Sequence, residues 1–315
     1  MLREKTLRQI DLIVPVYNEE EAIPKFAEAI SKVANSISPD KLHVIFVNDG
    51  SNDGTRKEIE SLDSKAFKLT CLNLSRNFGK EAALTAGMHN STGDAAIPID
   101  VDLQDPPQLI SELIADWKNG SDVVLARRIS RRDDSVSKRV SAKLYYKILG
   151  RLSSTQIPEN VGDFRLMDKK VVEAVNRLPE TTRFMKGILS WVGFNVSYVD
   201  YVRGSRSSGK TKFNFRKLWT FGIEGVTSFS IKPLKIWTYL GLFVSLFSLA
   251  FAIYLVIRVL ILGIETPGYA STMVAITLMG GLQLMGIGVI GEYLGRVFLE
   301  TKRRPIYLIS EIFKN

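Results

Sequence analysis

The stretch Ile97-Pro98-Ile99-Asp100-Val101-Asp102-Leu103-Gln104-Asp105-Pro106-Pro107 indicates how this chain of 315 residues is organised. The apolar run over residues 95–99 is typical of a buried strand, and it ends at two acids one residue apart. Because side chains alternate along an extended chain, Asp100 and Asp102 lie on the same side. Open α/β sheets bind ligands at the carboxyl ends of their strands, and carboxylate oxygens suit Mg²⁺ or Mn²⁺ carrying a diphosphate. A solvated acidic turn before the two prolines is the other interpretation.

Further apolar runs of strand length alternate with segments of helical spacing. The expected strands cover residues 12–16, 42–47, 69–74, 95–99 and 123–126, with another near 196–202. This alternation predicts βαβ units and an α/β fold with a mostly parallel sheet. Polar, turn-forming clusters follow the successive strands, so one cleft at the carboxyl edge of the sheet is expected to collect them.

Composition limits the kinds of partner. The formal net charge of +9 favours an anionic partner, which could be nucleic acid, anionic lipid or a phosphorylated substrate. The single cysteine, Cys71, excludes an internal disulfide, and its apolar neighbours indicate a place in the core. Two histidines argue against a zinc site built from histidine.

The apolar residues are concentrated late in the chain. Residues 236–257 and 268–291 contain no charged side chain, and each run is long enough to cross a bilayer. Lysines and arginines flank the pair on its outer ends, whereas the connector holds only Arg258 and Glu265. The positive-inside rule therefore predicts a helical hairpin with the N-terminal domain and the C-terminus in the cytoplasm. Two buried helices of a soluble domain are the disfavoured alternative.

The predicted organisation has five parts. They are a cytoplasmic catalytic domain over residues 1–212, an interfacial amphipathic segment over 213–232, transmembrane helices over 233–263 and 268–295, and a cytoplasmic basic tail over 296–315. The basic, aromatic-containing stretch 127–147 is either a solvated face or a surface that attracts anionic headgroups or a phosphorylated lipid.

Two further motifs fail in their context. Residues 204–211 (GSRSSGKT) satisfy the P-loop pattern, but the strand expected before them alternates and membrane helices follow. Residues 286–291 (GIGVIG) match the dinucleotide fingerprint, yet they lie inside a predicted membrane helix, where glycines favour close helix–helix approach.

Several segments together carry a resemblance to a known family. They are 14–20 (VPVYNEE), 47–51 (VNDGS), 77–81 (NFGKE), 100–106 (DVDLQDP), 162–167 (GDFRLM), 184–193 (FMKGILSWVG) and 211–213 (TKF), with the paired C-terminal spans. The chain resembles family 2 glycosyltransferases of GT-A fold, a Rossmann-like α/β architecture. Within that family it is similar to the bactoprenol (undecaprenyl-phosphate) glucosyltransferases, relatives of dolichol-phosphate mannose synthase. Asn48 departs from the pattern, because an acid commonly precedes Asp-Gly-Ser. The Gln-x-x-Arg-Trp motif of processive synthases is absent, which implies transfer of one sugar per acceptor.

The resemblance implies an inverting, metal-dependent hexosyltransferase at the bacterial inner membrane. The expected donor is UDP-glucose, with N-acetylglucosamine or mannose as alternative sugars, and the expected acceptor is undecaprenyl phosphate. Mg²⁺ or Mn²⁺ is the expected cofactor, the protein is expected to form a homo-oligomer, and no nucleic acid is expected as a partner.

The donor side carries over onto named residues. Asp102 is expected to bind the metal, and Asp100 to contact ribose or a metal-bound water. Gln104 and Asp105 are expected to shape the metal and sugar side, while the nucleoside pocket is assigned to Pro15, Tyr17, Glu19 and Asp49. Glu19 could instead act at a helix start, and Asp49 could instead cap a turn. Lys80 could contact the donor phosphates or pair with Glu81.

The acceptor side is expected to use Asp163, Arg165 and a group of basic residues. Asp163 matches a position often assigned as catalytic acid or base in the family. Because the acceptor phosphate is already an anion, an orienting role for Asp163 toward the acceptor, a metal-linked group or Arg165 is favoured over base catalysis. The acceptor phosphate is assigned to Arg127, Arg128, Arg206 and Lys212.

The same residues leave two other classes of function open. One is a basic membrane-anchored protein that captures nucleic acid or anionic lipid without catalysis. The acids at the strand ends would repel nucleic acid, which disfavours it. A transporter is disfavoured because two spans without an internal charge make a poor translocation path.

Overall fold

The computed structural model describes residues 7–129, 158, 161–181, 183, 185–202, 232–262 and 268–315. The predicted interfacial segment, apart from residue 232, and the P-loop-like segment 204–211 lie outside the described residues.

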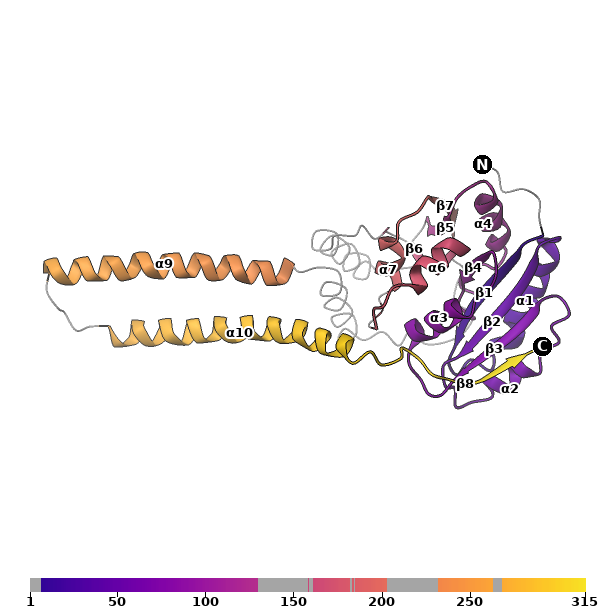
Figure 1. The fold of residues 1–315 in the computed structure, drawn as a ribbon, viewed down its shortest axis with the longest axis horizontal. Helices are drawn as coiled ribbons and strands as arrows, with labels where there is room; N and C mark the ends of the chain where they lie inside the picture. The colour runs from indigo at the N-terminus through magenta and orange to yellow at the C-terminus, as the bar shows by residue number, and fades with distance from the viewer. Residues whose placement is uncertain are drawn as a thin grey trace.

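An eight-stranded sheet forms the centre of the N-terminal domain, in the order β7-β5-β6-β4-β1-β2-β3-β8 (Figure 1). Its strands are β1 Gln9–Val16, β2 Lys41–Asn48, β3 Lys68–Leu74, β4 Ala95–Pro98, β5 Val123–Arg128, β6 Val161–Asp168, β7 Val196–Tyr201 and β8 Ile309–Lys314. Strands β6 and β8 run antiparallel to their neighbours, and the other pairings are parallel. The mostly parallel α/β sheet of the predicted GT-A fold is confirmed.

Helices cover both faces of this sheet. On one face lie α1 Ile23–Ser36, α2 Thr55–Glu60 and α4 Leu109–Lys118, and on the other lie α3 Lys80–His89, α6 Lys169–Asn176 and α7 Met185–Trp191. Alternation along the strands divides the core accordingly. Leu12 faces α1, whereas Ile13 faces α3, where Gly87 permits an approach that a Cβ atom would block at 2.2 Å.

Strand β6 was not predicted as a strand. Its residues facing α3 include the charged Asp163 and Arg165, and Gly162 adds a third position without an apolar side chain. This interrupts the apolar run that usually marks a central strand. β6 is a strand of the sheet between β4 and β5, and not a loop between elements. Because it runs antiparallel to both, its first residues lie at the carboxyl edge of the sheet.

The C-terminal residues differ from the predicted basic tail. Residues 309–314 form β8, which pairs with β3 and places Phe313 opposite Cys71. Ile309 and Phe313 pack against the core clusters on the two faces of the sheet, and Glu311 pairs with Arg56 at 2.6 Å. The basic residues before β8 concealed this short alternating strand in the sequence.

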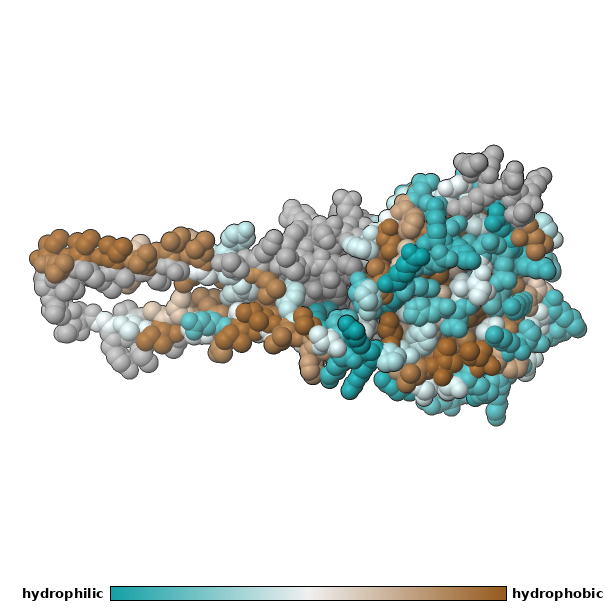
Figure 2. Space-filling model, viewed as in Figure 1, coloured by the Kyte–Doolittle hydropathy of each residue, from teal (hydrophilic) through white to brown (hydrophobic). Residues whose placement is uncertain are grey.

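Two long helices extend away from the α/β domain, side by side (Figure 1). They are α9 Lys232–Leu262 and α10 Tyr269–Thr301, so the second continues beyond the predicted end at residue 295. Apolar side chains cover much of their visible surface (Figure 2). Among the described residues, one segment, Leu278–Thr301, is long and apolar enough to cross a membrane, and α9 contains the shorter apolar segment Tyr239–Phe251. Within α10, a Cβ atom at Gly286 would lie 3.6 Å from the ring of Trp237 on α9, which fits the close helix–helix approach expected there. The other glycines of α10, at positions 280, 281, 288, 291 and 295, have no neighbour within 4 Å in the described part of the chain, so the expectation is not met at these positions.

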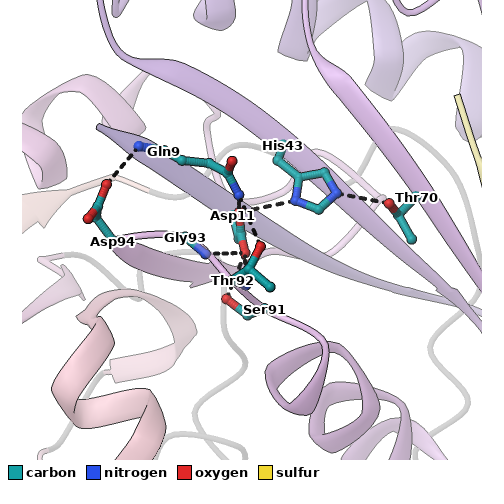
Figure 3. Close-up of polar contacts among 8 residues, drawn as sticks. All are labelled: Gln9, Asp11, His43, Thr70, Ser91, Thr92, Gly93 and Asp94. Carbon is teal, nitrogen blue, oxygen red and sulfur yellow. Dashed lines mark hydrogen bonds and ion pairs between the residues drawn. The ribbon is translucent and has the colours of Figure 1, made fainter. Parts of the chain in front are cut away.

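A fully buried carboxylate holds the amino-terminal side of the sheet together. Asp11 accepts hydrogen bonds from the backbone N–H groups of Thr92 and Gly93 at 2.7 and 2.8 Å and from the Ser91 hydroxyl at 2.8 Å. Figure 3 shows these contacts together with the contact to His43, whose other ring nitrogen reaches Thr70. Burial alone would raise the pKa of Asp11, but its hydrogen bonds to His43, Gln9 and the backbone lower it.

We expect Asp11→Asn to destabilise the domain. Loss of the charge-assisted hydrogen bonds should cost about 2–3 kcal/mol. Because the pKa of Asp11 is depressed in the folded protein, its contribution is present above the unfolded-state pKa and is lost as pH falls through the folded-state value. Thermal unfolding of the detergent-solubilised chain between pH 7 and pH 3 measures both effects. Asp63→Asn, at an exposed ion pair with Lys65, is the control and should change neither.

The rate at which the Cys71 thiol reacts is a measure of how well β8 covers β3, because Phe313 of β8 lies opposite Cys71. Cys71 is buried, and burial raises the pKa of its thiol to about 12. We expect a thiol reagent to label the folded chain slowly, because labelling needs access and a thiolate. Deleting residues 309–315 uncovers β3 and should accelerate labelling well before global unfolding. Equally slow labelling of the shortened chain would contradict the proposed covering of β3 by β8. Labelling of urea-unfolded protein defines complete reaction.

Candidate active site

The loops after β1 and β2 are joined by hydrogen bonds at the carboxyl edge of the sheet. Asn18 donates its N–H to the Ser51 hydroxyl at 3.0 Å and accepts the N–H of Asn52 at 2.8 Å through its side-chain oxygen. Asn18 has a φ of 55°, a conformation that asparagine tolerates better than most residues. Glu20 adds a third link by accepting the N–H of Gly54 at 2.8 Å. The two predicted motifs therefore form one unit.

Asp49 attaches the loop after β3 to this unit. Its carboxylate is buried and accepts the N–H groups of Phe78 and Gly79 at 2.7 and 2.9 Å. Burial raises the pKa of Asp49, and these two hydrogen bonds oppose that rise. The bonds fix the residues that begin α3, so Asp49 has the loop-capping contacts considered as an alternative to nucleoside binding.

Lys80, at the start of α3, joins two acidic segments. Its ammonium lies 2.7 and 2.9 Å from the two oxygens of Asp100 and 2.9 Å from Oδ2 of Asp163. Burial would lower the pKa of Lys80, but the charges of Asp163 and Asp100 raise it above its ordinary value. The sequence left contact with the donor phosphates and a pair with Glu81 both open for Lys80; the structure shows Asp100 and Asp163 as partners of its ammonium.

Asp102 lies in the turn that follows β4. Its Oδ1 accepts the N–H of Gln104 at 3.1 Å, and Leu103 between them has a φ of 54°. A left-handed conformation at leucine is unusual, and such strain concentrates at functional sites. The turn keeps Asp102 half-exposed while Gln104 and Asp105 are buried.

These residues fit a divalent cation by their chemistry. Asp100, Asp102 and Asp163 carry hard carboxylate oxygens, the ligands that Mg²⁺ and Mn²⁺ prefer. Within the described part of the chain, however, no three acidic, histidine or cysteine side chains are grouped so that they could hold a metal ion by themselves. A positive group already bridges two of them, because the Lys80 ammonium contacts both Asp100 and Asp163. Two carboxylates arranged around one cation match a site that a metal ion and a diphosphate could share.

Arg165 lies behind Asp163 on β6. It is 4% exposed and donates to the backbone oxygen of Gly162 at 2.7 Å. Burial lowers the pKa of Arg165 to about 10, and the charge of Asp163 opposes this shift. Arg165 is therefore placed to support Asp163 and the Gly162 backbone, with little surface for direct contact with a substrate.

The structure separates the two consecutive arginines of β5. Arg127 forms a two-point ion pair with Asp200, with distances of 2.6 and 2.9 Å, and lies over the ring of Tyr198. Arg128 instead donates to the hydroxyl of Tyr201 at 3.1 Å. Arg127 and Arg128 therefore have different partners, although they are consecutive in the sequence.

Arg128 is connected to the acidic loop through Asp105. The Tyr201 hydroxyl donates to Asp105 at 2.5 Å, and Arg128 lies 3.8 Å from the same carboxylate. Burial, followed by the hydrogen bond to Asp105, raises the pKa of Tyr201 to about 12. Arg206 and Lys212, the other two predicted acceptor residues, lie outside the described residues.

The remaining predicted residues line the unit formed by the first two loops. Pro15, the residue before the last of β1, is half-buried, and Tyr17 is 43% exposed. Glu19 donates its N–H to the Thr55 hydroxyl at 2.8 Å. The backbone oxygen of Glu19 also accepts from Ala22 and Ile23 at the start of α1, as a residue at a helix start does. An exposed tyrosine ring beside these loops offers a surface on which a nucleobase could stack.

Sequence reasoning missed three contributors. Asn18 was part of a quoted motif, and its turn-forming character was the available signal. The side-chain oxygen of Asn73 accepts a hydrogen bond from the side-chain amide of Asn48 at 2.9 Å, and both residues are buried. Asn48 stands where the family commonly has an acid, so this bond gives the exception a structural partner. Tyr201 comes from an alternating strand far along the chain, and nothing local marks its contact with Asp105.

Comparison with known proteins gives the same outline. Residues 11–175 match the family described as "Glycosyl transferase family 2", and residues 232–297 match the "GtrB C-terminal hairpin". A bactoprenol glucosyl transferase of Shigella phage SfX is 50% identical over 302 residues, which cover 96% of this chain and 99% of that relative. A prophage bactoprenol glucosyl transferase homolog of Escherichia coli strain K12 is 47% identical, covering 97% and 100%. An uncharacterized glycosyltransferase of Synechocystis is 48% identical, covering 97% and 96%.

Among solved structures, the mannosyltransferase PcManGT of Pyrobaculum calidifontis, in complex with GDP-Man and Mn²⁺, is 18% identical. The aligned region covers 70% of this chain and 61% of the PcManGT chain, with a TM-score of 0.49.

Gly50 tests whether the close approach of the loops matters. It has a φ of 67°, and a Cβ atom there would lie 2.5 Å from the backbone carbon of Arg76. Gly193, with a φ of 73° and open space around it, is the matched control. We expect Gly193→Ala to cost about 1–2 kcal/mol from its left-handed backbone alone. Gly50→Ala should cost more, because its Cβ atom would also collide with the loop after β3. Thermal unfolding measures both changes, and equal effects would contradict a role for the close approach of the loops.

Proposed function

We infer that this chain, which belongs to glycosyl transferase family 2, transfers a glucosyl residue to polyprenyl (bactoprenol) phosphate. The observation that carries this proposal is the meeting of Asp100 and Asp163 at Lys80, beside the turn of Asp102 at the carboxyl edge of the sheet. Relatives named bactoprenol glucosyl transferase, similar over nearly the whole chain, support the acceptor and the sugar. The hairpin family at residues 232–297 supports association with a membrane.

The proposed donor is UDP-glucose. Asp102, with Asp100 beside it, would hold Mg²⁺ or Mn²⁺ at the diphosphate. When bound, the ion supplies positive charge that stabilises the negative charge developing on the leaving diphosphate. Tyr17, Pro15 and Glu19 would form one side of the nucleoside pocket, and Asp49 would hold the loop that completes it. Gln104 would shape the sugar side of the acidic turn.

The acceptor phosphate is proposed to react directly. One of its oxygens attacks the anomeric carbon as the bond from that carbon to the UDP oxygen breaks, so UDP leaves and the anomeric configuration inverts. No proton must be removed from an anionic phosphate oxygen. Asp163, supported by Arg165, would therefore orient the reacting groups rather than act as a base. Arg128, with Arg206 and Lys212, would bind the acceptor phosphate; the ion pair with Asp200 makes Arg127 a weaker candidate.

The proposed location is the bacterial inner membrane, with the catalytic domain in the cytoplasm and α9 and α10 as two spans. Strand β8 follows α10 and pairs with β3 of the domain that precedes α9. A chain that leaves and re-enters one domain crosses a membrane an even number of times. This geometry supports a hairpin that crosses twice, and the glycines of α10 favour self-association into a homo-oligomer.

The test is synthesis of a lipid-linked sugar. The purified chain with UDP-glucose, undecaprenyl phosphate and Mg²⁺ or Mn²⁺ should yield undecaprenyl phosphate glucose with inverted configuration, identified by mass spectrometry and NMR. UDP-N-acetylglucosamine and GDP-mannose serve as competing donors. Absence of a lipid-linked product with any donor would overturn the proposal.

Asp102→Asn should reduce the rate by about a hundredfold or more, because it removes charge at the developing leaving group. Asparagine keeps an oxygen that can accept the Gln104 N–H, so the turn should persist. An unchanged thermal midpoint would confirm this, and Asp63→Asn should retain full activity. A fully active Asp102→Asn enzyme would remove Asp102 from the metal site.

A further inference from the structure

Lys80 holds the place of a cation between two acids of the active site. Its ammonium contacts both oxygens of Asp100 and one oxygen of Asp163. The Lys80 ammonium therefore contacts both carboxylate oxygens of Asp100. Whatever else binds Asp100 must first displace Lys80 or share it.

The arrangement is too exposed to be explained by stability alone. The side chains of Lys80, Asp100 and Asp163 are 44%, 36% and 24% exposed. Ion pairs in contact with water contribute little to folding, because solvent screens them and two side chains must be ordered. The same exposure leaves all three groups open to a ligand arriving at the carboxyl edge of the sheet.

We propose that Lys80 is an internal counter-ion that keeps a divalent cation from binding strongly until the nucleotide diphosphate arrives. This inference rests on the proposed function and concerns the order in which its site is filled. With the donor site empty, a metal ion must compete with Lys80 for the oxygens of Asp100 and is repelled by its charge. The donor diphosphate offers Lys80 alternative oxygens, which frees Asp100 for the metal ion.

The consequence is positive coupling between metal and nucleotide. Each makes binding of the other more favourable, and the two effects must be equal in size. A site built from carboxylates alone would instead take up Mg²⁺ or Mn²⁺ by itself. Lys80 is thus a positioning residue for the acids and a binding residue for the diphosphate.

The test measures Mn²⁺ binding without turnover. Full-length chain in detergent is titrated with Mn²⁺, and the free ion is followed by electron paramagnetic resonance, with and without UDP. The unmodified chain should bind Mn²⁺ weakly alone and about tenfold more tightly with UDP, a size common for coupled sites. Lys80→Met should bind Mn²⁺ about tenfold more tightly than the unmodified chain when UDP is absent, and UDP should then add little.

Three further variants separate this role from loss of charge or of fold. Lys80→Arg keeps the charge and should behave like the unmodified chain when UDP is absent. Lys170→Met removes a lysine that pairs with Asp122 at 2.8 Å away from the acidic turn, and it should change nothing. Lys80→Gln keeps a polar side chain and replaces Lys80→Met if the latter unfolds. Asp100→Asn combined with either change should abolish the gain in Mn²⁺ affinity.

The proposal is overturned if a folded Lys80→Met or Lys80→Gln chain binds Mn²⁺ no more tightly than the unmodified chain without UDP. It is also overturned if UDP does not strengthen Mn²⁺ binding to the unmodified chain. Neither measurement uses the lipid acceptor. A chain that makes the lipid-linked sugar but shows no coupling contradicts this inference alone, whereas coupling without product contradicts the proposed glucosyl transfer alone.

Discussion

The two hydrogen bonds that Asp49 accepts from the N–H groups of Phe78 and Gly79 determine where α3 begins. The first residue of that helix is Lys80, so the bonds also determine where its ammonium meets Asp100 and Asp163. The loops after β1 and β2 hold Asp49 in turn, through the bond from its N–H to Val16 and the links made by Asn18. Three strand ends thereby act together.

Charge is distributed to suit two anionic substrates. Carboxylates gather at the acidic turn and on β6, where a metal ion or Lys80 can neutralise them. Arginines lie one strand further along, where Arg128 reaches the same turn through Tyr201 and Asp105. The acidic loop is therefore contacted from both faces of the sheet, by Lys80 on one and by Arg128 on the other. An overall positive chain can in this way keep a local surplus of acids.

Much of this architecture follows from local patterns in the sequence. The end of an apolar run is a short-range property, so Asp100 and Asp102 could be placed after a strand, and the parallel strands could be predicted. Their expected place on one side of an extended chain was wrong, because β4 ends at Pro98 and the chain turns at residues 101–103. Partners distant in the sequence could not be placed. Strand order brings Asp100 and Asp163, both distant in the sequence, to the ammonium of Lys80. The sequence could not show that Arg127 pairs with Asp200 and Arg128 with Tyr201, because both partners come from β7, far along the chain. Strand β8 is short and follows basic residues, so only its pairing with β3 reveals it.

The position of β8 also couples folding of the α/β domain to synthesis of the whole chain. Because a chain is synthesised from its N-terminus, the last strand of the sheet appears after both long helices. Until then the outer edge of β3 has no partner from the C-terminal residues, and the side of Cys71 that Phe313 later covers stays open. The α/β domain therefore cannot complete its sheet early and wait for the hairpin. Its final edge is closed only when the hairpin has been made and its end has returned to the domain.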